Sequence, residues 1–169
     1  MGLLVLLLWA VLAGALPDAA PAALGIARHP PDLYVALAAY LAMRSTGPNV
    51  VRWGILLGLL ADCASLDPLG TRAFAIGVTT LAFSRRRGGS QGPTGPMVPF
   101  MVFAAALLAH LLYVVRVLPL HGAAPFFGAL AAGFPVALWT ALLSWPLLAV
   151  LDRTGAVDDL TGRHRARPA

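Results

Sequence analysis

Apolar runs follow one another along almost the whole chain, and short stretches rich in Gly, Pro and Arg separate them. Two of these runs are joined by the turn Ser-Leu-Asp-Pro-Leu-Gly and are expected to form a helical hairpin. Together with that hairpin, the pattern predicts six apolar helices, which lie in residues 2–16, 33–43, 51–83 (the hairpin, two helices), 97–118 and 125–151.

The first apolar run, residues 2–16, has two interpretations. A short apolar core followed by small residues and Pro17 is also typical of a signal peptide, but the basic segment that should precede such a core is missing. We therefore expect a retained, rather short transmembrane helix, with cleavage as the alternative.

The composition places these helices in a bilayer. Of the 169 residues, 59% are hydrophobic and only 11% are charged, which leaves more apolar surface than a soluble domain of this size can bury. We expect an all-α, polytopic membrane protein with one six-helix transmembrane domain over residues 1–151. Residues 152–169 are expected to form a polar, Arg-rich cytoplasmic tail.

The arginines predict the orientation. All twelve basic residues are Arg, and with six spans nine of them fall on the side that carries both termini. The positive-inside bias then places both termini in the cytoplasm of a bacterial inner membrane. The hairpin turn Asp67-Pro68-Leu69-Gly70 is expected on the outer side.

Asp62 is the most informative residue because a carboxylate within an apolar segment needs a partner or water. Gly54, Gly58 and Asp62 follow one another at intervals of four residues and share one helix face. Such a small-residue face allows another helix to approach closely. It is either a contact face for a partner protein or a packing face within the bundle, and the pattern does not choose between them.

Arg72 is a candidate partner for Asp62. The two residues are equally far from the turn residue Asp67, so in two helical limbs each would lie roughly 7 Å below the tip. An ion pair between them would lower the cost of both charges. In the alternative arrangement, Asp62 faces a water-filled cleft and Arg72 extends to the lipid headgroups.

Other chemistry is sparse. The chain has no HExxH, GxSxG or phosphate-loop motif and no acid pair at metal-ligand spacing, so we expect no enzyme, no metal and no cofactor. Nucleic-acid binding is disfavoured because no basic face with interleaved aromatic residues is present.

Single polar residues in the apolar helices have expected packing roles. His110 is expected to donate a hydrogen bond to a neighbouring helix. Thr140 and Ser144 are expected to form hydrogen bonds either with a neighbouring helix or with their own. Cys63 is expected to be a small packing residue.

The order of these features resembles the rod shape-determining protein MreD family. The resemblance rests on Pro31-Asp32 at the start of the second helix and on Gly54-x3-Gly58-x3-Asp62 followed by Pro68-Leu69-Gly70, within a chain of the family's size. It covers residues 31–83 well and the last two helices only by hydropathy. Cys63-Ala64 after the acid and a Gly/Pro-rich loop after Arg87 depart from the family pattern.

The resemblance implies a fold and a function. MreD proteins are non-enzymatic partners of MreC in the elongasome, the machinery that builds lateral peptidoglycan with MreB, RodA and a class B penicillin-binding transpeptidase. Their helical core is similar to the substrate-binding subunits of energy-coupling-factor transporters. The leading expectation is therefore a membrane scaffold that binds the transmembrane helix of MreC and maintains rod shape. The alternative is a transporter subunit that binds a vitamin-type small molecule near Asp62, Arg72 and His110.

Overall fold

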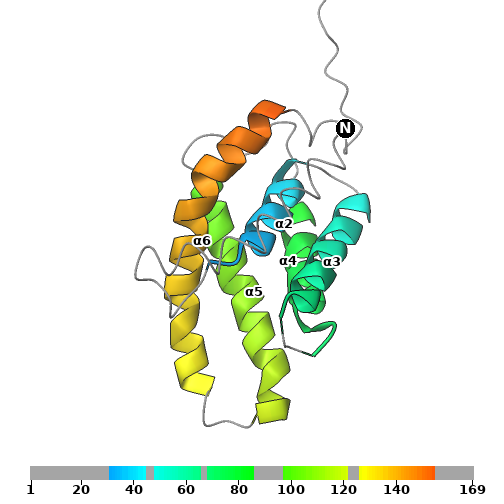
Figure 1. Cartoon of the computed structure of the whole chain (residues 1–169), viewed down its shortest axis with the longest axis vertical. Coiled ribbons are helices and arrows are strands. Elements are labelled where there is room, and N and C mark those ends of the chain that lie inside the picture. The colour runs from blue at the N-terminus through cyan, green and yellow to red at the C-terminus, as the bar shows by residue number, and fades with distance from the viewer. Residues whose placement is uncertain (1–30, 45–47, 66–67, 86–96, 122–125, 155–169) are drawn as a thin grey trace, which may run out of the picture.

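The computed structural model describes residues 31–44, 48–65, 68–85, 97–121 and 126–154. The predicted first helix over residues 2–16 lies outside these residues, as do Asp67, the linker over 86–96 and residues 155–169 of the predicted tail. The described part of the chain is all-helical (Figure 1) and contains five helices: α2 (Leu33–Arg44), α3 (Pro48–Cys63), α4 (Thr71–Arg85), α5 (Met97–His121) and α6 (Phe126–Thr154). A six-helix bundle is not confirmed.

The predicted apolar segments agree with these helices, with differences at the ends. α3 begins at Pro48, earlier than predicted, because proline is well tolerated at the first helical position. α6 extends to Thr154 and remains one helix through Pro135 and Pro146. The predicted domain boundary at residue 151 therefore falls inside a helix.

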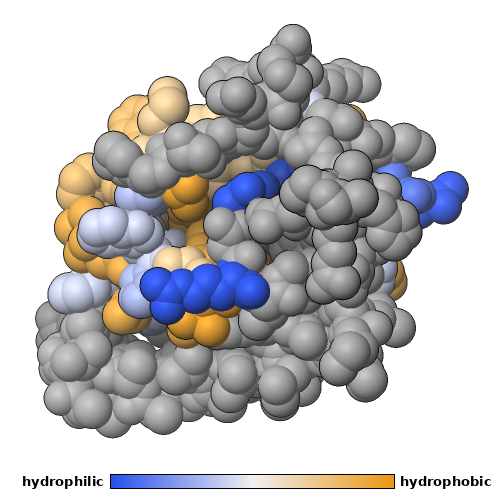
Figure 2. All heavy atoms as spheres, turned by 90° about the horizontal axis from the view of Figure 1, so that it is seen from above, coloured by the Kyte–Doolittle hydropathy of each residue, from blue (hydrophilic) through white to orange (hydrophobic). Residues whose placement is uncertain are grey.

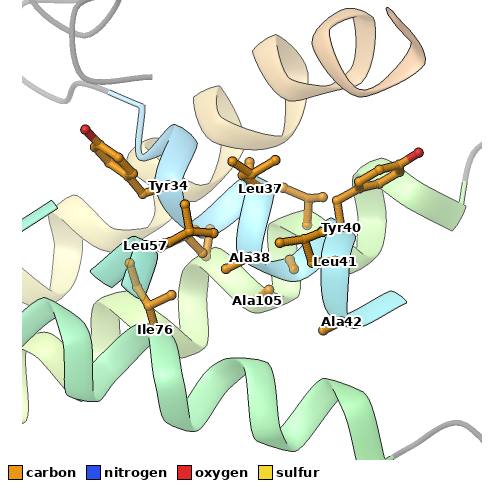
Figure 3. Packing of buried hydrophobic residues seen from close by; sticks show 14 of the residues in the cluster. Tyr34, Leu37, Ala38, Tyr40, Leu41, Ala42, Leu57, Ile76 and Ala105 are labelled. Carbon is orange, nitrogen blue, oxygen red and sulfur yellow. The ribbon is translucent and has the colours of Figure 1, made fainter. Parts of the chain in front are cut away.

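α2 is the central element of the fold. Every residue from Leu33 to Met43 is buried, and the helix contacts α3, α4, α5 and α6. In Figure 3, the side chains of Leu37 and Leu41 lie among residues from the surrounding helices, including Leu57, Ile76 and Ala105. A helix that is apolar on all sides is stable only when it is enclosed in this way.

Two antiparallel helix pairs surround α2. α3 and α4 form the predicted hairpin, α5 and α6 form the second pair, and α4 also contacts α5. Figure 1 shows that α5 and α6 extend past the turn between α3 and α4. The α3–α4 hairpin therefore accompanies only part of the length of the longer pair.

Two helices are long and apolar enough to cross a membrane, over residues 97–118 of α5 and 127–151 of α6. Only 28% and 33% of their most apolar windows are buried inside the protein, so they are not enclosed as core helices of a soluble protein would be. Hydrophobic residues also form much of the described surface at the end of the molecule shown in Figure 2. Exposed apolar surface of this extent is typical of helices that contact lipid or a partner protein.

Candidate functional site: the buried Asp62 and its polar neighbours

Asp62 lies at the end of α3 and binds the start of α4. Its side chain is buried, with an exposed fraction of 1%. Oδ1 accepts the backbone N–H of Arg72 at 2.8 Å, and Oδ2 accepts those of Gly70 at 2.8 Å and Ala73 at 3.2 Å. The carboxylate therefore caps α4 from a neighbouring helix, where a negative charge also interacts favourably with the helix dipole.

The turn before α4 completes this cap. Thr71 donates from both its backbone N–H and its hydroxyl to the carbonyl of Pro68. The first three amides of α4 thus all have acceptors, which buried helix ends require. Gly70 has φ of 91°, a conformation that favours glycine, and this geometry directs its N–H toward Asp62. Pro68 and Leu69 are exposed at the tip.

The glycine face of α3 packs against α4. A Cβ at Gly58 would overlap the Cα of Ala73 and would lie 2.8 Å from the Ala73 nitrogen, and a Cβ at Gly54 would lie 2.7 Å from the Cβ of Thr80. Both distances are too short for real contacts. Of the two interpretations of this face, the structure therefore shows packing within the bundle, and the face is not open to a partner helix.

Asp32 caps α2 in the usual local manner. Its Oδ1 accepts the N–H of Val35 at 3.1 Å, and its carbonyl accepts the N–H of Ala36 at 3.2 Å. Its own N–H donates to Thr140 Oγ1 on α6 at 2.8 Å, across 108 residues of sequence. This residue therefore connects the start of the central helix to the middle of α6.

Arg72 does not form the predicted ion pair with Asp62. Its backbone N–H binds that carboxylate, whereas its guanidinium Nη1 lies 3.8 Å from Oδ2 of Asp32. The guanidinium carbon also lies 5.7 Å from the ring centroid of Tyr113 on α5, which is a cation–π contact. Of the two arrangements left open by the sequence, the ion pair does not form, because helix capping orients the carboxylate toward backbone amides while the long Arg side chain reaches Asp32. Asp62 does not face a water-filled cleft either, because it is buried.

His110 joins α5 to α6, as predicted. Its Nε2 lies 2.8 Å from the carbonyl oxygen of Ala129, a contact in which the ring N–H donates. Gly133 makes room for the ring, since a Cβ there would lie 2.6 Å from His110 Cδ2. Thr140 realises both predicted alternatives. Its hydroxyl oxygen accepts the N–H of Asp32, the cap residue before α2, and its hydroxyl donates to the carbonyl of Val136 in its own helix at 2.7 Å.

Ser144 forms one of its two predicted hydrogen bonds, whereas Cys63 does not have its predicted role. The Ser144 hydroxyl donates to the carbonyl of Ala141 in its own helix, which was one of the two predicted arrangements. Cys63 is exposed, so its predicted packing role was wrong. It directly follows the buried Asp62 in the sequence.

The polar side chains of this region bind backbone groups and each other. In the described ranges, no group of three or more His, Cys, Asp or Glu residues could hold a metal ion. The arrangement fixes the relative positions of helices: Asp62 joins α3 to α4, the Asp32–Arg72 pair joins α2 to α4, and Thr140 joins α2 to α6.

Sequence reasoning identified Asp62 but missed the contacts of Asp32. An Asp immediately before an apolar helix, and after Pro31, is a recognisable N-cap signal, so the local cap could have been predicted. Its contacts with Thr140 and Arg72 depend on how helices far apart in sequence pack, and no local pattern encodes them.

Comparison of the chain with protein-family models, curated proteins and solved structures gave no match. The resemblance to MreD proteins therefore rests on the motifs described above.

Proposed function

We propose that the protein is an MreD-type membrane scaffold of the cell-wall elongation machinery. In this proposal it has six transmembrane helices in a bacterial inner membrane, with both termini in the cytoplasm. It binds the transmembrane helix of MreC and works without catalysis or cofactor alongside RodA, MreB and a class B penicillin-binding transpeptidase.

One observation carries the proposal: the motif residues of the resemblance have structural roles in a single unit. Asp32 caps α2, Asp62 caps α4, Gly58 allows α3 and α4 to touch, and Gly70 supplies the turn. Asp62 has an exposed fraction of 1%, and its carboxylate accepts three backbone N–H groups of the same protein. Residues used in this way support a rigid body that presents surfaces to partner proteins.

The partner helix would dock on a lipid-facing surface, because the glycine face is covered by α4. α3 offers one such surface in Ile55, Leu56, Leu59 and Leu60, each at least 40% exposed. α6 offers another, which includes Leu142 and Trp145. One bulky substitution on each surface distinguishes the two. Leu56→Trp and Leu142→Trp should both leave the fold intact, and only the substitution on the docking surface should reduce recovery of MreC.

A second candidate function is a small-molecule-binding subunit of a transporter. The observation that favours it is the group formed by Asp32, Arg72 and Tyr113, whose charged side chains are partly exposed, at 24% for Asp32 and 33% for Arg72. A convergent group of polar side chains at the edge of an apolar bundle is typical of ligand sites. Asp62, which the sequence placed at such a site, is instead fully used as a cap.

Depletion of the protein in its rod-shaped host separates the two functions. The scaffold proposal predicts that cells become round while vitamin uptake stays normal, and that a plasmid copy restores rod shape. A vitamin requirement in cells of normal shape would contradict the scaffold and support the transporter subunit. A plasmid copy with Gly128→Ala serves as a matched control, because that position has no neighbour within 4 Å of an added Cβ.

A further inference from the structure

One side of α3 carries a continuous stripe of exposed side chains, which recur at intervals of three and four residues. The four large apolar members are between 40% and 48% exposed. The opposite side of the helix is covered, because Gly54 and Gly58 pack against α4. The α3 stripe, which the described helices leave uncovered, consists of Arg52, Ile55, Leu56, Leu59, Leu60 and Cys63.

α6 also exposes an apolar stripe, and its length matches a bilayer. The large exposed side chains begin at Leu130 and continue through Leu138 and Trp145 to Val150. Positions 130 and 150 are 20 residues apart, which corresponds to roughly 30 Å along a helix, the usual thickness of a hydrocarbon core. Lipid acyl chains can therefore cover this stripe along its whole length, and it needs no protein partner.

The α3 stripe is too short for the same bilayer. Arg52 and Cys63 are 11 residues apart, which corresponds to about 17 Å, and the chain then turns back into α4. Lipid could cover so short a stripe only if the bilayer became thinner beside it. Because thinning has a cost, a short apolar surface favours association with another helix over contact with lipid.

Arg52 adds a charge to this surface. Its side chain is exposed, and its Nη1 lies 3.5 Å from Oδ1 of Asn49, a long contact at the surface. Arg52 lies one helical turn before Leu56 on the same side of α3. A helix that lies along the stripe and carries a carboxylate at this level would bind both parts of the surface, because a charge-assisted hydrogen bond between guanidinium and carboxylate is stronger than one between neutral groups.

We propose that the α3 stripe, and not the surface of α6, binds the partner transmembrane helix, and that this helix carries a carboxylate near its cytoplasmic end that pairs with Arg52. The apolar side chains of the partner helix pack on Ile55, Leu56, Leu59 and Leu60, while α6 stays in contact with lipid. This inference rests on the proposed scaffold function, because it assigns the surface at which MreC is held.

Site-specific photo-cross-linking in the host cell tests which surface is occupied. A benzophenone amino acid replaces either Leu56 or Leu142, two leucines of nearly equal exposure at 48% and 50%. The tagged protein is purified after illumination, and the products are probed for MreC. The inference predicts a product with MreC from position 56 and none from position 142. It is overturned by an MreC product from position 142, or if position 56 links only to a second copy or within its own chain.

Charge reversal tests the carboxylate. Arg52→Glu should lower the recovery of MreC, relative to the amount of protein in the membrane, by roughly fivefold or more, and Arg52→Lys should keep most of it. Arg153→Glu is the matched control, since Arg153 is exposed and the end of α6 lies toward the same end of the molecule as the start of α3 (Figure 1). Both reversals change the net charge equally. The same recovery from both would contradict a role of Arg52 in docking.

Wild-type protein separates failure of this inference from failure of the scaffold function. If wild-type protein recovers MreC but position 56 does not link to it, the surface assignment is wrong and the scaffold function stands. If MreC is absent both from purified wild-type protein and from every cross-linked product, the scaffold function is wrong, and the docking surface is wrong with it.

Discussion

Removal of the Asp62 carboxylate should release the start of α4 from α3. In Asp62→Ala, three backbone N–H groups lose the acceptor that they have in the folded protein. A hydrogen bond to a charged group contributes about 1.5–3 kcal/mol, but the three share one carboxylate and removal of a buried charge recovers part of its desolvation cost. We therefore expect the free energy of unfolding to fall by roughly 3–6 kcal/mol, less than the sum of three separate bonds.

Asp62→Asn should cost less. The amide keeps one acceptor oxygen, but its NH₂ group faces amide donors that it cannot bind, so a loss of roughly 1–3 kcal/mol is expected. Equilibrium unfolding of the purified protein in mild detergent, induced by SDS and followed by tryptophan fluorescence, measures both variants. Far-UV circular dichroism before unfolding checks that the helices have formed.

Arg72→Gln supplies the decisive comparison. It changes the guanidinium but keeps the backbone N–H that Asp62 accepts. If the cap explains the role of Asp62, the effects of Asp62→Asn and Arg72→Gln should add to within about 0.5 kcal/mol. A coupling well above that value would show that the two side chains interact as an ion pair and would refute the capping account.

Three further substitutions test close contacts in the bundle. Gly58→Ala should lower the unfolding midpoint strongly, because its Cβ would overlap the α4 backbone, whereas Gly128→Ala should change it little. Thr140→Val should cost about 1–3 kcal/mol by leaving the first amide of the α2 cap without an acceptor, and Thr140→Ser should restore most of that loss. Gly133→Ala should be destabilising because its Cβ would meet the His110 ring, and adding His110→Ala should relieve part of that effect. Thermal unfolding followed by tryptophan fluorescence measures all of these variants.

The sequence predicts the described helices well because each is a nearly continuous apolar run. The breaks between them contain Gly and Pro, which interrupt helices for local steric reasons. The ends are less predictable, as at α6, where the polar residues after Leu151 continue the helix to Thr154. The short length of α2 was visible in the sequence, but its complete enclosure was not, since burial depends on how the other helices surround it.

The candidate site was only partly predictable. Asp62 was identified because an acid in an apolar run is unusual, and Gly58 because of its spacing from that acid. The use of the carboxylate as a cap depends on the conformation of the turn, which brings amides eight to eleven residues away to a single side chain. The contact between Asp32 and Thr140 spans 108 residues and follows from tertiary packing alone.

Ala42 illustrates the same limit, because its segment of the sequence does not show how tightly it is enclosed. Its segment has no regular stripe of small residues, so a large side chain there would be expected to do little harm. In the structure, Ala42 has an exposed fraction of 0% on the enclosed helix α2. Ala42→Leu should therefore destabilise the bundle, and Gly128 on α6 is the better control position.

The scaffold proposal is tested most directly by affinity purification of the tagged, full-length protein from its own host in mild detergent. The account predicts that MreC and RodA are recovered with the wild-type protein and with Gly128→Ala, and that recovery falls for Asp62→Ala as the bundle loses stability. Recovery of intact, monodisperse protein with neither MreC nor RodA would contradict it.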